Sequence, residues 1–171
     1  MKKRSYIILI GVLLATVNCF SQSKIRIACV GNSITYGAGI ADRETNSYPA
    51  QLGSMLGETY DVRNFGKSGT TLLRKGNLPY WDAEERRRAL DFQPNWVFIM
   101  LGTNDSKPVN RVFLEEYVQD YKELIMSFRG LPVHPRIVLL LPVPVFSTDT
   151  TGITAGIVAD SILPMVRQVA Y

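Results

Sequence analysis

The segment Trp96–Leu101 reads WVFIML and is continuously apolar. A strand that is apolar at every position is expected to be buried on both faces, as in parallel sheets that helices cover on two sides. The residues that follow, GTND at 102–105, are polar and begin with a glycine, so we expect the strand to end at Leu101. The segment therefore predicts an interior strand of a parallel α/β sheet.

Strand-like and helix-like segments alternate on both sides of this strand. The other strand-like segments are 25–30 (IRIACV), 60–65 and 136–141. The helix-like segments are 47–56, 82–92, 113–129 and a last one that starts at about residue 154. This alternation predicts a three-layer α/β/α sandwich with a parallel sheet in the flavodoxin-like strand order 2-1-3-4. A helix after the fourth strand normally leads to a fifth strand, which is missing from this sequence.

The N-terminus has the pattern of a secretory signal peptide. Basic residues at positions 2 to 4 precede an apolar run at 6–17, and polar residues end that run. Spanning a membrane needs about 20 apolar residues, so no stable span is expected in the mature protein. We therefore expect a signal peptide at 1–21 and a single domain at 22–171.

The cleavage site is expected between Ser21 and Gln22, because Cys19 and Ser21 are small residues at the positions that signal peptidase reads. This predicts export to the periplasm or the extracellular space. A lipoprotein acylated at Cys19 is the alternative, and the bulk of Asn18 directly before the cysteine disfavours it.

Charge and composition exclude several classes of function. The formal net charge of +4 falls to +1 when the three basic residues of the signal peptide are removed, so no nucleic-acid partner is expected. Two cysteines and one histidine cannot build a disulfide framework or a Cys/His zinc cluster. A Cys/His metal cluster is therefore excluded, and we expect no metal and no organic cofactor.

Three polar segments leave the first three strands: GNSIT at 31–35, NFGKSG at 64–69 and GTND at 102–105. In the order 2-1-3-4 they are neighbours at the carboxyl edge of the sheet, where doubly wound proteins bind their ligands. They would place the hydroxyl of Ser33 beside a glycine amide and the carboxamide of Asn104. A nucleophilic hydroxyl with N–H donors for an oxyanion is what acyl transfer requires.

These three segments resemble, in order and position, the first three sequence blocks of the SGNH (GDSL-type) hydrolase superfamily. The resemblance covers essentially all of residues 24–171. It implies that Ser33 is the nucleophile and that Gly66 and Asn104 complete an oxyanion hole with the backbone N–H of Ser33. One departure is Asn32, which stands where the family usually has an aspartate; that position does not supply the nucleophile.

A second departure concerns the general base. The family's Asp-x-x-His block, which follows the fifth strand, has no counterpart in this chain, so the catalytic His and Asp of the family are absent from it. His134 precedes the fourth strand and is expected on the surface at the opposite end of the sheet, roughly 20 Å from Ser33. Supplying the missing elements would take roughly 40–60 residues, so we expect this sequence to be C-terminally truncated.

The resemblance implies a secreted serine esterase that hydrolyses small acyl esters, acetyl esters above all, on carbohydrates, similar to carbohydrate and sialate O-acetylesterases. Without the base, this 171-residue form is expected to have little activity. The alternative is a non-catalytic module, or an inactive fragment, that binds a carbohydrate or a partner in the same pocket. The gene sequence beyond Tyr171 discriminates the two, because an in-frame Asp-x-x-His block supports the enzyme.

Several further residues could have either a structural or a functional role. Tyr80 and Trp81 could stack on a sugar ring or close the core. Asp105 is expected to hold its own loop by hydrogen bonds rather than to act as a base. The charged run 84–88 is expected to be a solvated helix face, with binding of an acidic polymer as the alternative, and Cys29 is expected to be a small core residue.

Overall fold

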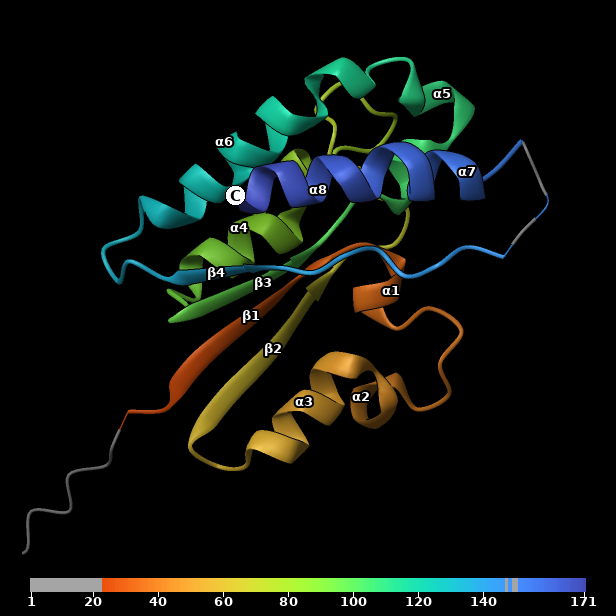
Figure 1. The fold of residues 1–171 in the computed structure, drawn as a ribbon. Helices are drawn as coiled ribbons and strands as arrows, with labels where there is room; N and C mark the ends of the chain where they lie inside the picture. The colour runs from red at the N-terminus through yellow and green to blue at the C-terminus, as the bar shows by residue number, and fades with distance from the viewer. Residues whose placement is uncertain (1–22, 147, 149–150) are drawn as a thin grey trace, which may run out of the picture.

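The computed structural model of the protein describes residues 23–146, 148 and 151–171 (Figure 1). The predicted signal peptide, with Cys19 and its cleavage site at Ser21 and Gln22, lies outside the described residues. The strands are β1 (Ile25–Gly31), β2 (Tyr60–Gly66), β3 (Trp96–Met100) and β4 (Arg136–Leu139). The α-helices are α1 (Ser33–Tyr36), α2 (Arg43–Asn46), α3 (Tyr48–Leu56), α4 (Glu84–Asp91), α5 (Pro108–Arg111), α6 (Tyr117–Arg129), α7 (Ala155–Ile157) and α8 (Leu163–Ala170). Short 3-10 helices are η1 (Tyr80–Asp82), η2 (Thr103–Ser106) and η3 (Leu114–Glu116), and η4 (Val158–Ile162) is a π-helical turn.

The sheet is parallel throughout and has the order β2-β1-β3-β4, which confirms the predicted order. Within the described ranges it has four strands, with β2 and β4 at its edges. Strand β1 is central: its last residue, Gly31, pairs with Gly66 at the end of β2 and with Met100 at the end of β3. This register brings three strand ends to one edge of the sheet.

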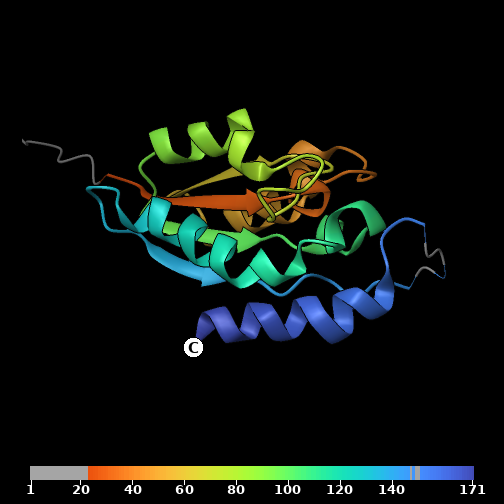
Figure 2. The ribbon, with the colours of Figure 1, turned by 90° about the horizontal axis from the view of Figure 1, so that it is seen from above.

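Helices lie on both faces of the sheet, as predicted for an α/β/α sandwich (Figures 1 and 2). Ala28 and Val30 of β1 face the side covered by α4, α6 and α8, and they belong to one buried cluster with the apolar side chains of those helices. The other face of the sheet carries α3 on the β2 side. The WVFIML segment forms the interior strand β3, as predicted, and Val97, Ile99 and Leu101 are 0% exposed on one face. Trp96 and Phe98 on the other face are only half-buried, and the strand ends at Met100, one residue earlier than expected.

The predicted elements differ from the observed ones mainly at their ends. The helix expected at 113–129 begins with the 3-10 turn η3 and becomes α-helical only at Tyr117. The fourth strand ends at Leu139, two residues earlier than expected, because Pro142 and Pro144 follow and cannot donate to a sheet ladder. The last helix contains the π turn η4 directly before Pro164, where a proline removes a regular helical hydrogen bond.

Candidate active site

Ser33 is placed at the carboxyl edge of the sheet by a tight turn between β1 and α1. Asn32 caps α1: its Oδ1 accepts a hydrogen bond from the N–H of Ile34 at 3.0 Å. Asn32 is fully buried, and a neutral carboxamide is as good an N-cap as a carboxylate, so the exchange of the family's aspartate preserves the turn. Ser33 is half-buried, and among the described residues its Oγ makes no hydrogen bond. The hydroxyl is therefore available to a ligand.

Asn104 lies in η2, directly after the end of β3. Its side chain is buried, and Nδ2 donates to the carbonyl of Thr70 at 2.9 Å. Its own backbone carbonyl accepts a hydrogen bond from Nδ2 of Asn110 at 2.8 Å. These two contacts fix the carboxamide between two loops. They leave the second proton of Nδ2 uncommitted, which is the donor that an oxyanion would use.

Gly66 lies at the end of β2, under the helix that carries Ser33. A Cβ at this position would overlap the backbone nitrogen of Tyr36 and would lie 2.7 Å from the carbonyl carbon of Thr35. Glycine is therefore required here by the close approach of α1. Its backbone N–H donates to Oδ1 of Asn64 at 2.9 Å, so the proton expected to face an oxyanion has a partner within the protein.

Asn64 is a site residue to which the sequence assigned no role. Its Nδ2 donates to the carbonyl of Thr35 at 2.7 Å while its Oδ1 holds the amide of Gly66. It therefore links β2 to α1. The Asn-x-Gly spacing is typical of such a local turn, and this was the signal in the sequence that could have identified it.

Asp105 follows Asn104 and is fully buried. Its carboxylate accepts hydrogen bonds from the backbone N–H groups of Leu72 at 3.1 Å and Leu73 at 2.8 Å. Burial raises the pKa of Asp105 to about 6, because desolvation outweighs the stabilising effect of these N–H donors. The geometry agrees with the expectation that Asp105 holds a loop, here the one that follows β2.

His134 lies at the opposite edge of the sheet from Ser33. It is exposed, in the connection between α6 and β4, with a left-handed φ of 46°. The next strand residue, Arg136, pairs with Trp96 at the amino end of β3, whereas Ser33 follows the carboxyl end of β1. His134 is therefore a surface residue, as expected, and the single histidine of the chain is not near Ser33.

The structure decides between the two roles considered for Tyr80 and Trp81. Tyr80 is fully buried, and its hydroxyl donates to the carbonyl of Phe65 at 2.7 Å, so it closes the core and cannot stack on a sugar. Trp81 is half-buried, and the guanidinium groups of Arg74 and Arg86 lie over its ring, at 3.7 and 4.4 Å from the centroid. Cations therefore occupy the ring surface that a sugar would need.

Two of the remaining expectations are also met. Arg87 on α4 forms exposed ion pairs with Glu84 and Asp91 at spacings of three and four residues. Cys29 is fully buried, and burial raises the pKa of its thiol to about 12. A protonated, inaccessible thiol is a core residue rather than a nucleophile.

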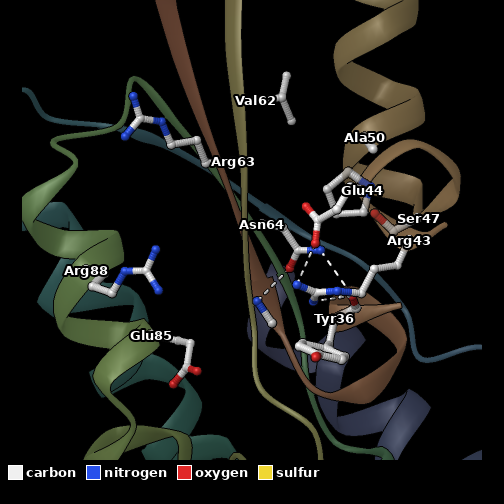
Figure 3. A pocket seen from close by; sticks show the side chains of 12 residues that line it. Tyr36, Arg43, Glu44, Ser47, Ala50, Val62, Arg63, Asn64, Glu85 and Arg88 are labelled. Carbon is white, nitrogen blue, oxygen red and sulfur yellow. Dashed lines mark hydrogen bonds and ion pairs between the residues drawn. The ribbon is translucent and has the colours of Figure 1, made fainter. Parts of the chain in front are cut away.

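A cavity of about 400 Å³ lies beside the candidate site (Figure 3). It reaches Gly66 and Tyr36 and extends along β2 between α3 and α4. Among the described residues, no group of three or more His, Cys, Asp or Glu side chains is arranged to hold a metal ion. In the same part of the chain, no helix has the length and apolar character needed to cross a membrane.

The parallel sheet in the order β2-β1-β3-β4 and the three strand ends that meet at one edge agree with the fold that the family resemblance implies. A family model described as "GDSL-like Lipase/Acylhydrolase family" matches residues 29–168. The chain belongs to the GDSL-like lipase/acylhydrolase family.

Similar proteins include proteins named as esterases. The chain is 38% identical over 178 residues to an acetylxylan esterase of Xylanibacter ruminicola; the alignment covers 94% of this chain and 37% of the relative, so the chain spans well under half of the relative's length. Est24, a carbohydrate acetylesterase from Sinorhizobium meliloti, has a similar fold, with a TM-score of 0.70 at 18% identity over 86% of this chain and 80% of that chain. An inhibitor-bound aryl esterase of M. smegmatis gives a TM-score of 0.63 at 19% identity, over 86% and 80% of the two chains.

Proposed function

We propose that the protein is a serine esterase that removes small acyl groups, chiefly acetyl, from carbohydrate esters. The observation that carries this proposal is the position of Ser33, whose unbonded hydroxyl stands at the edge where β1, β2 and β3 end. The 38% identity to an acetylxylan esterase supports acetylated carbohydrate as the substrate class. The carbohydrate acetylesterase with a similar fold is consistent with it.

The reaction assigns a role to each of the three predicted site residues. Ser33 Oγ attacks the acyl carbonyl carbon and its proton passes to a general base. The oxyanion that forms accepts hydrogen bonds from the Ser33 N–H, from the free proton of Asn104 Nδ2, and from the Gly66 N–H once this is released from Asn64. Collapse of the tetrahedral intermediate expels the sugar alcohol, and water then hydrolyses the acyl-enzyme to release the acid.

Neither His134 nor Asp105 is placed to act as the general base. His134 lies at the wrong edge of the sheet, and Asp105 is buried with its oxygens bonded to two backbone amides. The family resemblance implies an Asp-x-x-His block for this role. A non-catalytic module with the same pocket is the competing function, and it predicts that Ser33 has no effect on ester hydrolysis.

We also propose that the protein is exported, with cleavage between Ser21 and Gln22. The basic start, the apolar run and the small residues before the cut support this route. Mass spectrometry of the protein isolated from the periplasm or medium should give Gln22 as the N-terminal residue. A lipid-modified Cys19 would contradict the proposal.

The test of the enzymatic proposal is acetate release from acetylated xylo-oligosaccharides by the full-length gene product and by its Ser33→Ala variant. We expect release by the wild type and a loss of at least about 10³-fold in the variant, because the nucleophile is absent. A variant as active as the wild type would exclude the role assigned to Ser33. Absence of release by both proteins, with p-nitrophenyl acetate also intact, would favour the binding module.

A further inference from the structure

The cavity beside Gly66 has two facing walls (Figure 3). One wall is formed by α1 to α3 and includes Tyr36 and Arg43; the other is formed by α4 and includes Arg88, and β2, which carries Arg63, runs between them. Tyr36 stands three residues after Ser33 in the single turn of α1. The cavity therefore begins about one helical turn from Ser33.

Two of the three arginines around the cavity are held by neighbours. Arg43 pairs with Glu44 at 2.6 Å, and its guanidinium stacks over the ring of Tyr36 at 4.0 Å. Arg63 pairs with Asp61 through two hydrogen bonds of 2.8 and 3.1 Å. The positive charge of each is thus matched by an adjacent carboxylate.

Arg88 differs from the other arginines of the cavity. The described residues give its guanidinium no ion pair, no hydrogen bond and no ring contact, although it lines the cavity. Glu85, one turn earlier on α4, pairs instead with Lys67 at 3.3 Å. Figure 3 shows the Arg88 side chain directed away from α4, towards the wall that contains Tyr36 and Arg43. The cavity therefore presents one uncompensated cation, with five N–H donors, to whatever fills it.

A guanidinium that lacks a protein partner is suited to a planar carboxylate, which it can bind through two parallel hydrogen bonds. A volume of about 400 Å³ is in the range of sites that hold a small ligand such as one or two sugar rings. In a polysaccharide, the group with this chemistry is the carboxylate of a uronic acid.

We infer that the cavity is a subsite for an acidic sugar residue and that Arg88 binds its carboxylate. The inference rests on the proposed function, since it places the alcohol portion of the ester along β2. It assigns a substrate preference: acetyl groups on sugars next to a uronic acid are bound better than acetyl groups on a neutral chain. Arg88 is then a specificity-determining residue outside the reacting atoms.

Binding is measured on the Ser33→Ala variant of the full-length gene product, so that turnover does not interfere. The titrants are a xylo-oligosaccharide with one glucuronic acid side group, the same oligosaccharide without it, and sodium acetate. We expect the acidic oligosaccharide to bind at least about tenfold more tightly than the neutral one, as a charge-assisted hydrogen-bonded pair would give. Acetate, which offers the carboxylate without the sugar, should bind far more weakly than the acidic oligosaccharide.

Adding Arg88→Ala should abolish the preference, and Arg88→Lys should restore part of it, because a lysine keeps the charge without the bidentate geometry. Arg87→Ala is the matched control, since Arg87 is next to Arg88 on α4 and is exposed like it, but is paired with Glu84 and Asp91. Equal binding of acidic and neutral oligosaccharides, or equal losses in the Arg88→Ala and Arg87→Ala proteins, would overturn the inference. Acetate binding as tight as that of the acidic oligosaccharide would also overturn the inference, because the site would then bind any carboxylate without recognising the sugar.

These outcomes are distinguishable from failure of the proposed function. Hydrolysis of p-nitrophenyl acetate by the protein with an intact Ser33 reports on the esterase and involves no sugar. Binding of the acidic oligosaccharide without any hydrolysis would contradict the proposed esterase function and would support the carboxylate-binding subsite. Hydrolysis without a preference for the acidic oligosaccharide would contradict only the role inferred for Arg88.

Discussion

Asn64 Oδ1 accepts a hydrogen bond from the backbone N–H of Gly66 at 2.9 Å, and the same carboxamide donates to the carbonyl of Thr35 at 2.7 Å. Asn64 thereby ties strand β2 to the helix that begins with Ser33. The Gly66 N–H has one proton, so it can serve an oxyanion only when the bond to Asn64 lengthens or is shared. Asn64 is therefore both an anchor for α1 and a competitor for the donor.

The contact between Gly66 and α1 leads to the first prediction. Gly66→Ala places a Cβ against the backbone of Tyr36 and Thr35, which cannot move without shifting the turn that carries Ser33. We expect a loss of stability of about 3 kcal/mol or more and loss of esterase activity. Gly53→Ala is the control: its Cβ would meet Val62 at an ordinary 3.4 Å, so unfolding free energy should change by less than about 1 kcal/mol. Urea denaturation of both variants checks this, and a Gly66→Ala protein as stable as Gly53→Ala would contradict it.

Asn104 gives the second prediction. Asn104→Ala removes the free Nδ2 proton from the oxyanion hole, and kcat for acetyl-ester hydrolysis should fall by about 10²–10³ with little change in KM. The lost hydrogen bond to Thr70 should cost only about 1 kcal/mol of stability, so the fold should survive. Steady-state kinetics and a thermal melt of the same sample separate the loss of kcat from the loss of stability. A kcat within tenfold of the wild type would remove Asn104 from the oxyanion hole.

Asp105 makes stability depend on pH. Its folded-state pKa of about 6 lies above the value of about 3.9 for an unfolded chain, so protonation favours the folded state. Its contribution is therefore largest below pH 4 and is lost as pH rises through 6. The free energy of unfolding of the wild type, minus that of the Asp105→Asn protein, should fall by about 3 kcal/mol from pH 4 to pH 7. A flat or rising difference would mean that the two amide hydrogen bonds dominate over burial.

His134 should be dispensable. It is exposed at the amino edge of the sheet, so His134→Ala should leave kcat and KM of the full-length gene product within about twofold of the wild type. The pH–rate profile of the His134→Ala protein should also match that of the wild type. A tenfold loss of kcat would require His134 to approach Ser33, which the parallel sheet between them prevents.

The layout of the fold could be predicted because it follows from local pattern. The apolar run at 96–101 and the glycines that end three strands determine which segments meet, and parallel strands bring Ser33, Gly66 and Asn104 to one edge.

Other features depend on three-dimensional packing and could not be predicted. The hydrogen bond from Asn64 to the carbonyl of Thr35 joins two separate elements, and the burial of Tyr80 depends on its reach to the carbonyl of Phe65. The isolation of Arg88 appears only when Glu85 pairs with Lys67, since the sequence spacing would equally allow Glu85 to pair with Arg88.

The most direct test of the central claim, that Ser33 is the nucleophile, is covalent labelling. The full-length gene product is treated with an alkyl fluorophosphonate, and peptides are analysed by mass spectrometry. We predict one adduct, on the peptide that contains Ser33, formed with loss of fluoride and with parallel loss of acetyl-ester hydrolysis, and no adduct in the Ser33→Ala variant. Labelling of another residue with the same loss of activity, or an active protein whose Ser33 stays unmodified, would contradict it.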